Sequence, residues 1–484
     1  GKQTARERIQ ELLDPGTMTE IGLFGGIHPD AAGNGKPAVG GDGVVTCQGN
    51  INGRRVYVFA QDFTVKGGSV GKIHGRKITR IQDLALQNGS PLIGLNDSGG
   101  APIQEGVNSL AAYGEIFQRN IQMSGVVPQI SVILGPCAGG AVYSPAMTDF
   151  VFMVKNTSQM FITGPDVIRE VTHEEVDFES LGGADVHHTK SGVAHFSHNT
   201  ETEAIQHVRW LLSFLPSNNL SQPPRINGDD QFQRKTPEIQ QILPQSPKTP
   251  YDITGVILSL VDQGEFIEIQ KQYARNIVTG FARLNGHSVG VVANQPDHLA
   301  GVIDLDASDK AARFIRFCDA FHIPILTLVD TPGFMPGVDQ EHRGIIRHGA
   351  KLIFAYGEAT VPKITLILRK SYGGAYIVMG SKHLGADCNL AFPGSEIAVM
   401  GPDGAVKILN KQDLKNSKNP TSLKESLAEQ YRREVANPYL AASEGYLDDI
   451  ISPDESRFRI ITALESLLNK RRKTPDRKHG NIPL

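Results

Sequence analysis

Two sequence motifs recur in this chain in the same order and 233 residues apart. The turn pair Asn52-Gly53 precedes a short apolar run, and Asn285-Gly286 precedes another. Further along, an apolar run leads into Asp97–Gly100, and a second one leads into Asp330–Gly333. A shared order at one spacing indicates an internal duplication, so we expect the chain to fold as two similar halves.

A third motif completes the repeat at a spacing of 234 residues. Apolar runs end at Gly139-Gly140-Ala141 in the first half and at Gly373-Gly374-Ala375 in the second. In each half, short β-branched runs alternate with helical stretches such as residues 72–86. This alternation predicts an α/β fold in which crossover connections join the strands.

A stretch rich in Pro, Gln, Asn and Ser separates the two halves. We therefore predict an N-terminal domain at 1–222, a linker at 223–247 and a C-terminal domain at 248–484. One helix of the second half is well marked, because an apolar stripe follows Ser308. Serine is a preferred N-cap residue, so we expect that helix to begin directly after Ser308.

Composition argues against several classes of protein. A net charge of −3 does not provide the basic face of a nucleic-acid-binding domain. No apolar window approaches the roughly 18 residues of a membrane span. The four cysteines are far apart, which fits neither a disulfide framework nor a zinc site. We expect no metal from this chain, and the run Asp304–Asp309 lacks the glycine and terminal glutamate of a calcium loop.

Glycine is over-represented, at 51 of 484 residues against a usual share of about 7%. Much of the excess lies in the turns that follow the repeated strands. Without a Cβ atom, such a turn lets a ligand approach backbone N–H groups, and a helix start directs those groups outward. Two such turns side by side would bind an oxyanion. The alternative is that the glycines only permit tight turns and close helix packing, and the residues by themselves leave both interpretations open.

Gly67-Gly68-Ser69-Val70-Gly71 matches the G-x-S-x-G pattern of a nucleophile elbow. It lies between the strand expected at 56–59 and the helix expected at 72–86. However, the strand ends several residues too early, and the second half does not repeat the motif. A serine hydrolase centred on Ser69 is therefore a distant alternative.

Six long segments are similar to the carboxyltransferase (β) subunit of biotin-dependent acyl-CoA carboxylases. They span residues 41–45, 61–69, 97–106, 135–146, 369–376 and 477–484. The resemblance covers essentially the whole chain and is strongest to the propionyl-CoA carboxylase branch. It implies two tandem crotonase-like domains, each a ββα spiral, in a homo-hexamer built as a trimer of dimers. The acyl-CoA side would lie on the N-terminal domain and the biotin side on the C-terminal domain of the dimer partner.

The resemblance also implies the chemistry: CO₂ moves from carboxybiotin to the α carbon of a short-chain acyl-CoA, through an enolate. Propionyl-CoA, acetyl-CoA or both would be substrates. Gly139 and Gly140 would donate N–H groups to the thioester oxygen, and Gly374 and Ala375 would hold the biotin ureido oxygen. The substrate-binding residues implied in the same way are Gly67, Gly68, Ser69, Gly99, Gly100, Ala101 and Ile377.

The expected partner proteins would supply the parts of the reaction for which this chain has no sequence motif. It contains no Met-Lys-Met biotinylation motif and no ATP-binding loop. The resemblance therefore implies a biotin carboxylase subunit and a separate biotin carboxyl carrier domain, with no nucleic acid. We expect a cytoplasmic protein, or a mitochondrial matrix protein if the source is eukaryotic.

Three positions qualify the resemblance. Pro102 stands where the family commonly has Arg after Ser-Gly-Gly-Ala. Ile377 stands where propionyl-preferring members usually have Asp and acetyl- or broad-specificity members often have Ile. Gly401–Val406 is similar to the sodium-pumping methylmalonyl-CoA decarboxylases. A decarboxylase subunit with a membrane-embedded partner is therefore the main alternative function.

Overall fold

Each half of the chain contains a tight antiparallel hairpin at its Asn-Gly pair. In the first half, strands β2 (Val44–Ile51) and β3 (Arg54–Gln61) pair around Asn52-Gly53. In the second half, β10 (Ile277–Leu284) and β11 (His287–Asn294) pair around Asn285-Gly286. All four turn residues have positive φ, between 49° and 79°. A two-residue type I′ turn requires this conformation, and Asn-Gly adopts it readily.

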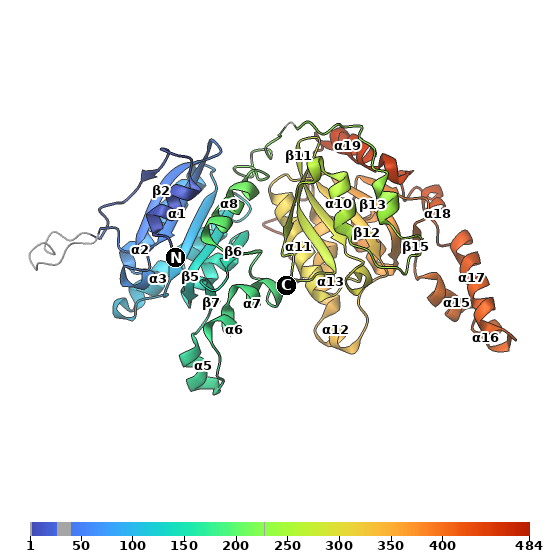
Figure 1. Ribbon diagram of the computed structural model, residues 1–484, viewed down its shortest axis with the longest axis horizontal. Helices are drawn as coiled ribbons and strands as arrows, with labels where there is room; N and C mark the ends of the chain where they lie inside the picture. Colours follow the sequence, from blue (N-terminus) through green and yellow to red (C-terminus); the bar gives the residue numbers. More distant parts are fainter. Residues whose placement is uncertain (1, 27–39, 227) are drawn as a thin grey trace, which may run out of the picture. The chain divides into compact units, whose positions relative to one another are not determined.

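The computed structural model describes residues 2–26, 40–226 and 228–484. The chain forms two units, each with its own core (Figure 1). The first unit extends to Pro224 and includes Gln270–Tyr273, and the second comprises Arg225–Ile269 and Ala274–Leu484. The predicted α/β fold with two duplicated halves is confirmed by this pair of units.

The two sheets have the same strand order. In the first unit it is β1-β2-β3-β4-β5-β6-β8, with β7 paired to β5. In the second it is β9-β10-β11-β12-β13-β14-β16, with β15 paired to β13. The first three strands of each series are antiparallel and the rest are parallel. The remaining strands are β1 (Thr19–Glu20), β4 (Leu92–Ser98), β5 (Gln129–Ala138), β6 (Phe150–Val154), β7 (Gln159–Phe161), β8 (Phe196–His198), β9 (Phe266–Ile269), β12 (Ile325–Thr331), β13 (Lys363–Tyr372), β14 (Cys388–Ala391), β15 (Glu396–Ala398) and β16 (Asp449–Ile450).

Helices connect the parallel strands, because such strands need a crossover. In the first unit α2 packs against α3, and in the second α11 packs against α13 (Figure 1). The helices of the first unit are α1 (Ala5–Leu12), α2 (Lys72–Gln87), α3 (Val107–Met123), α4 (Gly140–Met147), α5 (Pro165–Thr172), α6 (Phe178–Gly182), α7 (Ala184–Thr189) and α8 (Glu201–Leu212). Those of the second are α9 (Glu238–Ile242), α10 (Ile253–Leu260), α11 (Leu305–Ala320), α12 (Val338–His342), α13 (Ile345–Glu358), α14 (Gly373–Val378), α15 (Pro402–Leu409), α16 (Lys411–Asn416), α17 (Pro420–Glu434), α18 (Pro438–Ser443) and α19 (Ser456–Leu467).

Helix α11 begins earlier than its sequence suggested. Its N-cap is Asp304, whose carboxylate accepts the N–H of Ala307 at 2.8 Å. The predicted N-cap, Ser308, lies inside the helix, and its hydroxyl donates to the carbonyl of Asp304 at 2.8 Å. The prediction was wrong because both residues are good caps, and Asp304 stands one turn earlier.

The predicted domain boundaries remain a prediction, but the expected linker contains packed structure. From Arg225 onward the chain belongs to the second unit. Helix α9 lies inside the predicted linker, and its Ile239 is fully buried in that unit's core. The prolines around this single helical turn interrupt any periodic pattern, so no periodicity predicts it.

Both sheets have the same irregularity at the end of their fourth strand. The register of β4 against β5 shifts between Asn96 and Ser98, and that of β12 against β13 shifts between Val329 and Thr331. Such bulges change the direction of the strand and of its side chains near the end of a sheet. In both units the shift places a buried aspartate, Asp97 or Asp330, at the strand end.

The first-unit turn at Lys66–Gly68 requires glycine for two separate reasons. Gly68 has φ +62°, and a Cβ there would lie 2.1 Å from the carbonyl oxygen of Asp97. Gly16 also has positive φ, +75°, but its Cβ would meet nothing within 4 Å. Comparison of the two positions therefore separates the steric clash from the backbone strain.

We predict that Gly68→Ala lowers the apparent melting temperature far more than Gly16→Ala. Gly16→Ala carries only the strain of a left-handed residue, about 1 kcal/mol. Gly68→Ala must in addition move the end of strand β4. Differential scanning calorimetry on both variants measures the effect, and equal shifts would contradict this packing.

Candidate functional site

In the first unit, strand β5 turns into helix α4 at the predicted glycine pair. Gly139 is the N-cap, with φ +58°, and Gly140 is the first residue of the helix. The N–H of Gly139 donates to the carbonyl oxygens of Phe161 and Ile162, each at 3.1 Å. The N–H of Gly140 has no acceptor within the helix, because the first N–H groups of any helix lack one. The geometry therefore favours Gly140 over Gly139 as a donor to a ligand.

The second unit has the same arrangement where β13 turns into α14. Gly373 has φ +58° and begins the helix, followed by Gly374 and Ala375. Gly374 is exposed and Ala375 is fully buried. Their N–H groups are within the first turn of the helix and have no acceptor inside it. Ile377 lies on the same helix and is 43% exposed.

The predicted substrate-binding residues of the first unit lie around the start of α4. The N–H of Gly99 donates to the carbonyl of Gly67 at 2.8 Å, and the N–H of Val70 donates to the carbonyl of Gly100 at 2.9 Å. A Cβ on Gly100 would lie 2.8 Å from the carbonyl oxygen of Ala138. The structure thus brings the 67–70, 99–101 and 138–140 segments together. Pro102 follows as the N-cap of the short 3-10 helix Ile103–Glu105.

Ser69 lacks the partners of a catalytic serine. It is half-buried, and among the described residues no histidine is hydrogen-bonded to its hydroxyl. His74, the histidine nearest in sequence, is fully buried and contacts the carbonyl of Asp42 at 3.0 Å and the side chain of Gln61 at 3.3 Å. Burial lowers the pKa of His74 to about 4. The structure gives no support to the serine hydrolase alternative.

A buried ion network that the sequence analysis missed lies behind the Gly99 turn. Asp97 pairs with Arg8 at 3.1 Å and with Lys2 at 2.9 Å. Arg8 also pairs with Glu201 at 2.7 Å. The N–H of Asp97 donates to the side-chain oxygen of Gln61 at 3.1 Å. A buried charge needs such partners, since an unpaired one is costly.

The second unit has a matching network around Asp330. Its carboxylate contacts Arg369 at 2.7 Å, Lys370 at 3.1 Å and the hydroxyl of Tyr251 at 3.0 Å. Its N–H donates to the side chain of Asn294 at 3.2 Å. Asn294 and Gln61, like Asp330 and Asp97, are 233 residues apart. The repeat spacing was therefore a signal for these residues, although it does not reveal their partners.

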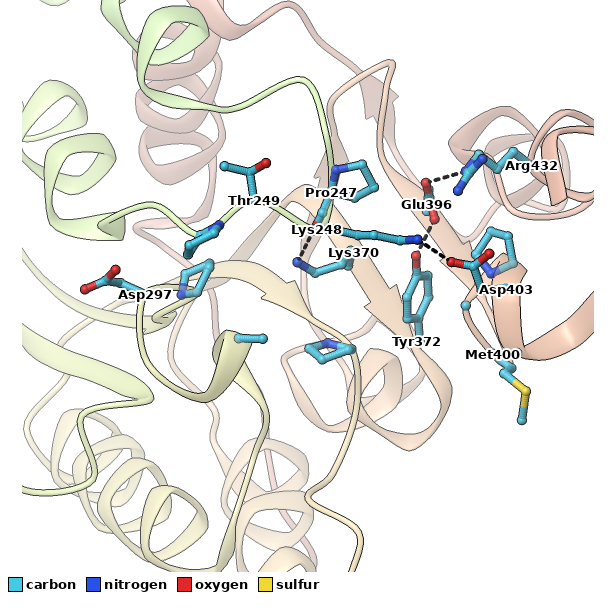
Figure 2. A pocket seen from close by; sticks show the side chains of 17 residues that line it. Pro247, Lys248, Thr249, Asp297, Lys370, Tyr372, Glu396, Met400, Asp403 and Arg432 are labelled. Atoms are coloured by element: carbon cyan, nitrogen blue, oxygen red, sulfur yellow. Dashed lines mark hydrogen bonds and ion pairs between the residues drawn. The ribbon is translucent and has the colours of Figure 1, made fainter. Parts of the chain in front are cut away.

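A cavity of about 650 Å³ opens beside the residue that precedes α14 (Figure 2). Tyr372 lines it, and the Tyr372 hydroxyl donates to Glu396, which also pairs with Arg432 at 3.0 Å. Ala300 and Pro332 also line it, and they occupy the positions equivalent to Gly67 and Gly99 of the first unit. The other lining residues are Pro247, Lys248, Thr249, Pro250, Pro296, Asp297, Lys370, Met400, Gly401, Pro402, Asp403 and Gly404.

The four cysteine thiols are buried or half-buried, which disfavours the thiolate that a nucleophile needs. Burial raises the pKa of the Cys137 thiol, on strand β5, to about 12. Within residues 2–26, 40–226 and 228–484, no group of three His, Cys, Asp or Glu side chains could hold a metal ion. Over the same residues, no helix is long and apolar enough to cross a membrane.

Comparison with known proteins adds an independent line of evidence. Residues 1–482 match the model of the carboxyl transferase domain family. The chain is 57% identical to the propionyl-CoA carboxylase carboxyltransferase subunit of Haloferax mediterranei, and 54% identical to the methylmalonyl-CoA decarboxylase α subunit of Propionigenium modestum. Each alignment spans 484 residues and covers 100% of this chain and 94% of the relative. A crystal structure of transcarboxylase 12S, with methylmalonyl-coenzyme A and methylmalonic acid bound, matches with a TM-score of 0.95 at 48% identity, covering 100% of this chain and 93% of that one.

We predict that a serine-reactive phosphonate forms no adduct at Ser69, because no histidine is placed to take the proton from its hydroxyl. Intact-mass spectrometry of the treated protein and of Ser69→Ala measures this directly. A single adduct on the native chain that is lost in Ser69→Ala would contradict the prediction.

Proposed function

This chain belongs to the carboxyl transferase family, and we propose that it transfers CO₂ from carboxybiotin to the α carbon of propionyl-CoA, acetyl-CoA or both. It would thus be the carboxyltransferase subunit of a biotin-dependent acyl-CoA carboxylase. The observation that carries the proposal is the repeated strand-to-helix turn: each unit presents N–H groups without intrahelical acceptors at the start of a helix, at Gly140 and at Gly374. Two carbonyl-bearing reactants need two such sites.

On the acyl-CoA side, the N–H of Gly140 donates to the thioester oxygen. Loss of the α proton moves an electron pair toward the carbonyl, so negative charge develops on that oxygen. The N–H group stabilises this charge without any reorganisation. Gly139, whose N–H is already donated to Phe161 and Ile162, holds the turn in shape. The turns at 67–70 and 99–101 are hydrogen-bonded to each other. They would place backbone atoms next to the bound thioester.

On the biotin side, the N–H of the exposed Gly374 would hold the ureido oxygen, whereas Ala375, the other residue that the resemblance implies, is fully buried. The fit rests on two features of the second unit: the N–H of Gly374 has no acceptor in α14, and the cavity of about 650 Å³ begins at the neighbouring Tyr372. Its lining includes five prolines, whose apolar surfaces suit a bicyclic ring, beside charged side chains such as Lys370 and Glu396. Bound carboxybiotin supplies both the carboxyl group and the base that takes the α proton.

We further propose that each complete site combines the first unit of one subunit with the second unit of its dimer partner, within a homo-hexamer. The transcarboxylase 12S structure, whose name describes a hexamer assembly, supports this by its similarity along the full chain. A biotin carboxylase subunit and a biotin carrier domain complete the enzyme. The proposed location is the cytoplasm, or the mitochondrial matrix in a eukaryote.

A methylmalonyl-CoA decarboxylase subunit is the second candidate. The 54% identity to such a subunit and the similarity of Gly401–Val406 favour it. The transfer step is the same in both enzymes and runs in opposite directions, so the partner chains distinguish them. Purification of the native complex with its companion subunits decides between a soluble biotin carboxylase and a membrane-embedded sodium pump.

We predict that the purified chain moves the carboxyl group from methylmalonyl-CoA or malonyl-CoA to free biotin, and that Gly140→Val removes this activity. A Cβ on Gly140 would lie 2.8 Å from the Tyr113 ring and displace the start of α4. Valine keeps the backbone N–H, but this displacement moves it out of line with the thioester oxygen, and loss of an oxyanion donor costs about 10²–10³-fold in kcat.

The matched control is Gly114→Val, an exposed helical position where a Cβ meets nothing within 4 Å. We expect Gly114→Val to keep its activity, and both variants to keep the oligomeric state of the native protein on size-exclusion chromatography. No transfer by the native chain would overturn the proposed function. Full transfer by Gly140→Val would overturn the role of that N–H group.

We predict that Ile377→Asp changes the ratio of kcat/KM for propionyl-CoA over acetyl-CoA by roughly 10-fold. The two substrates differ by one methylene, and a difference of one methylene changes kcat/KM by about 10-fold or more in a hydrophobic pocket. Ile377 lies on α14 and is exposed enough to meet a substrate. Steady-state kinetics with both acyl-CoAs measures the ratio. An unchanged ratio would remove Ile377 from the specificity-determining residues.

A further inference from the structure

Asp330 is the centre of a buried charged cluster in the second unit, which we define as Asp330, Arg369, Lys370 and Tyr251. Asp330 itself is fully buried at the end of β12. Arg369 and Lys370 bring two positive charges against one negative charge. Arg369 also lies over the Tyr251 ring, 4.5 Å from its centroid. The surplus of donors in this cluster needs further acceptors.

Those acceptors are carbonyl oxygens of one short segment, residues 246–249. Arg369 donates to Ser246 at 2.9 Å and to Thr249 at 3.0 Å. Lys370 donates to Pro247 at 2.7 Å. The backbone of Pro247 and Pro250 has no N–H, so this segment cannot pair as a strand. Its carbonyls are held by these two side chains.

The same segment forms one wall of the cavity beside α14 (Figure 2). Pro247, Lys248, Thr249 and Pro250 all line the cavity. Lys248 also forms an ion pair at 2.6 Å with Asp403, another lining residue. Displacement of the segment would therefore change the shape of the cavity directly.

The cluster also lies on the strand that leads into α14. Lys370 and Tyr372 are two residues apart on β13, so they share one face of the sheet, and both line the cavity. Gly373 and Gly374 follow at once. One group of side chains thus contacts both the cavity wall and the strand end that sets the position of the helix start.

We propose that Lys370 and Arg369 are positioning residues for the biotin-side site, which they shape by fastening residues 246–250 and the end of β13 to Asp330. This proposal rests on the proposed function in naming biotin as the ligand. Neither residue needs to touch the ligand or the reacting atoms. Their effect is to keep one cavity wall at a fixed distance from the first N–H groups of α14.

The first unit offers a matched comparison. There Lys2, which precedes helix α1, pairs with the equivalent aspartate, Asp97, at 2.9 Å. Lys2→Met therefore removes a lysine–aspartate pair of the same kind from the acyl-CoA side. A surface control is Lys235→Met, whose lysine is 74% exposed and pairs with Asp454 at 3.3 Å.

The test is steady-state transfer between methylmalonyl-CoA and free biotin in the full-length protein. We expect Lys370→Met to raise KM for biotin by about 10-fold, because a hydrogen bond to Pro247 and an ion pair with Asp330 are lost, and to leave KM for the acyl-CoA unchanged. Lys370→Arg can donate to the same carbonyl and the same carboxylate and is expected to recover most of the loss. Tyr251→Phe removes only the hydroxyl and is expected to have a smaller effect in the same direction.

Lys2→Met and Lys235→Met are both expected to leave KM for biotin unchanged. An unchanged KM for biotin in Lys370→Met, or an equal rise in both KM values, would overturn the proposal. Failure of Lys370→Arg to recover the loss would also count against it.

A second measurement does not depend on the activity. Hydrogen–deuterium exchange of peptides covering 246–251 is expected to speed up in Lys370→Met and not in Lys235→Met. If exchange speeds up but the native chain transfers nothing, the positioning role stands and the proposed function fails. If transfer proceeds and exchange is unchanged, the proposed function stands and the positioning role fails.

Discussion

The two candidate sites depend on backbone N–H groups that are left without acceptors where a strand gives way to a helix. A helix cannot satisfy its own first N–H groups, so some other acceptor must do so. At Gly139 this acceptor is protein, namely the carbonyls of Phe161 and Ile162. At Gly140 and Gly374 the acceptor can be a substrate oxygen. The rest of each unit holds these few groups in place: a crossover helix packed on the sheet, a bulge at the neighbouring strand end, and a buried aspartate behind the turn.

Because the fold is duplicated, the same strand-to-helix turn occurs twice, once for each of the two proposed reactants. The units share strand order, hairpins, bulges and the Asp97/Asp330 pair, yet their surroundings have diverged. Asp97 is neutralised by cations before and within α1, whereas Asp330 is neutralised by cations on β13 and accepts a hydrogen bond from Tyr251, which precedes α10. In the second unit, Lys370, which pairs with Asp330, also lines the cavity beside the start of α14. This divergence fits a division of labour between a thioester and a ureido ring.

Much of this fold could be predicted from local sequence. Asn-Gly pairs specify tight hairpins, because a two-residue turn depends only on residues close together in the chain. The 233-residue spacing specifies a repeat, because it requires only that the same motifs recur in the same order. What could not be predicted depends on contacts distant in sequence. The hydrogen bond between Tyr251 and Asp330 joins residues 79 apart, and the acceptors of Gly139 come from the end of a three-residue strand, β7, and from the residue after it. The cap of α11 could not be chosen from the sequence either, since Asp304 and Ser308 are both suitable caps.

In the proposed reaction, a backbone N–H at the start of α4 polarises the thioester carbonyl. Infrared difference spectroscopy of propionyl-CoA carrying ¹³C at that carbonyl measures the polarisation directly, since hydrogen bonding weakens the C=O bond. We predict a carbonyl band at lower frequency on the native protein than in water, and no such shift on Gly140→Val. An unshifted band on the native protein, or the same shift on Gly140→Val, would contradict it.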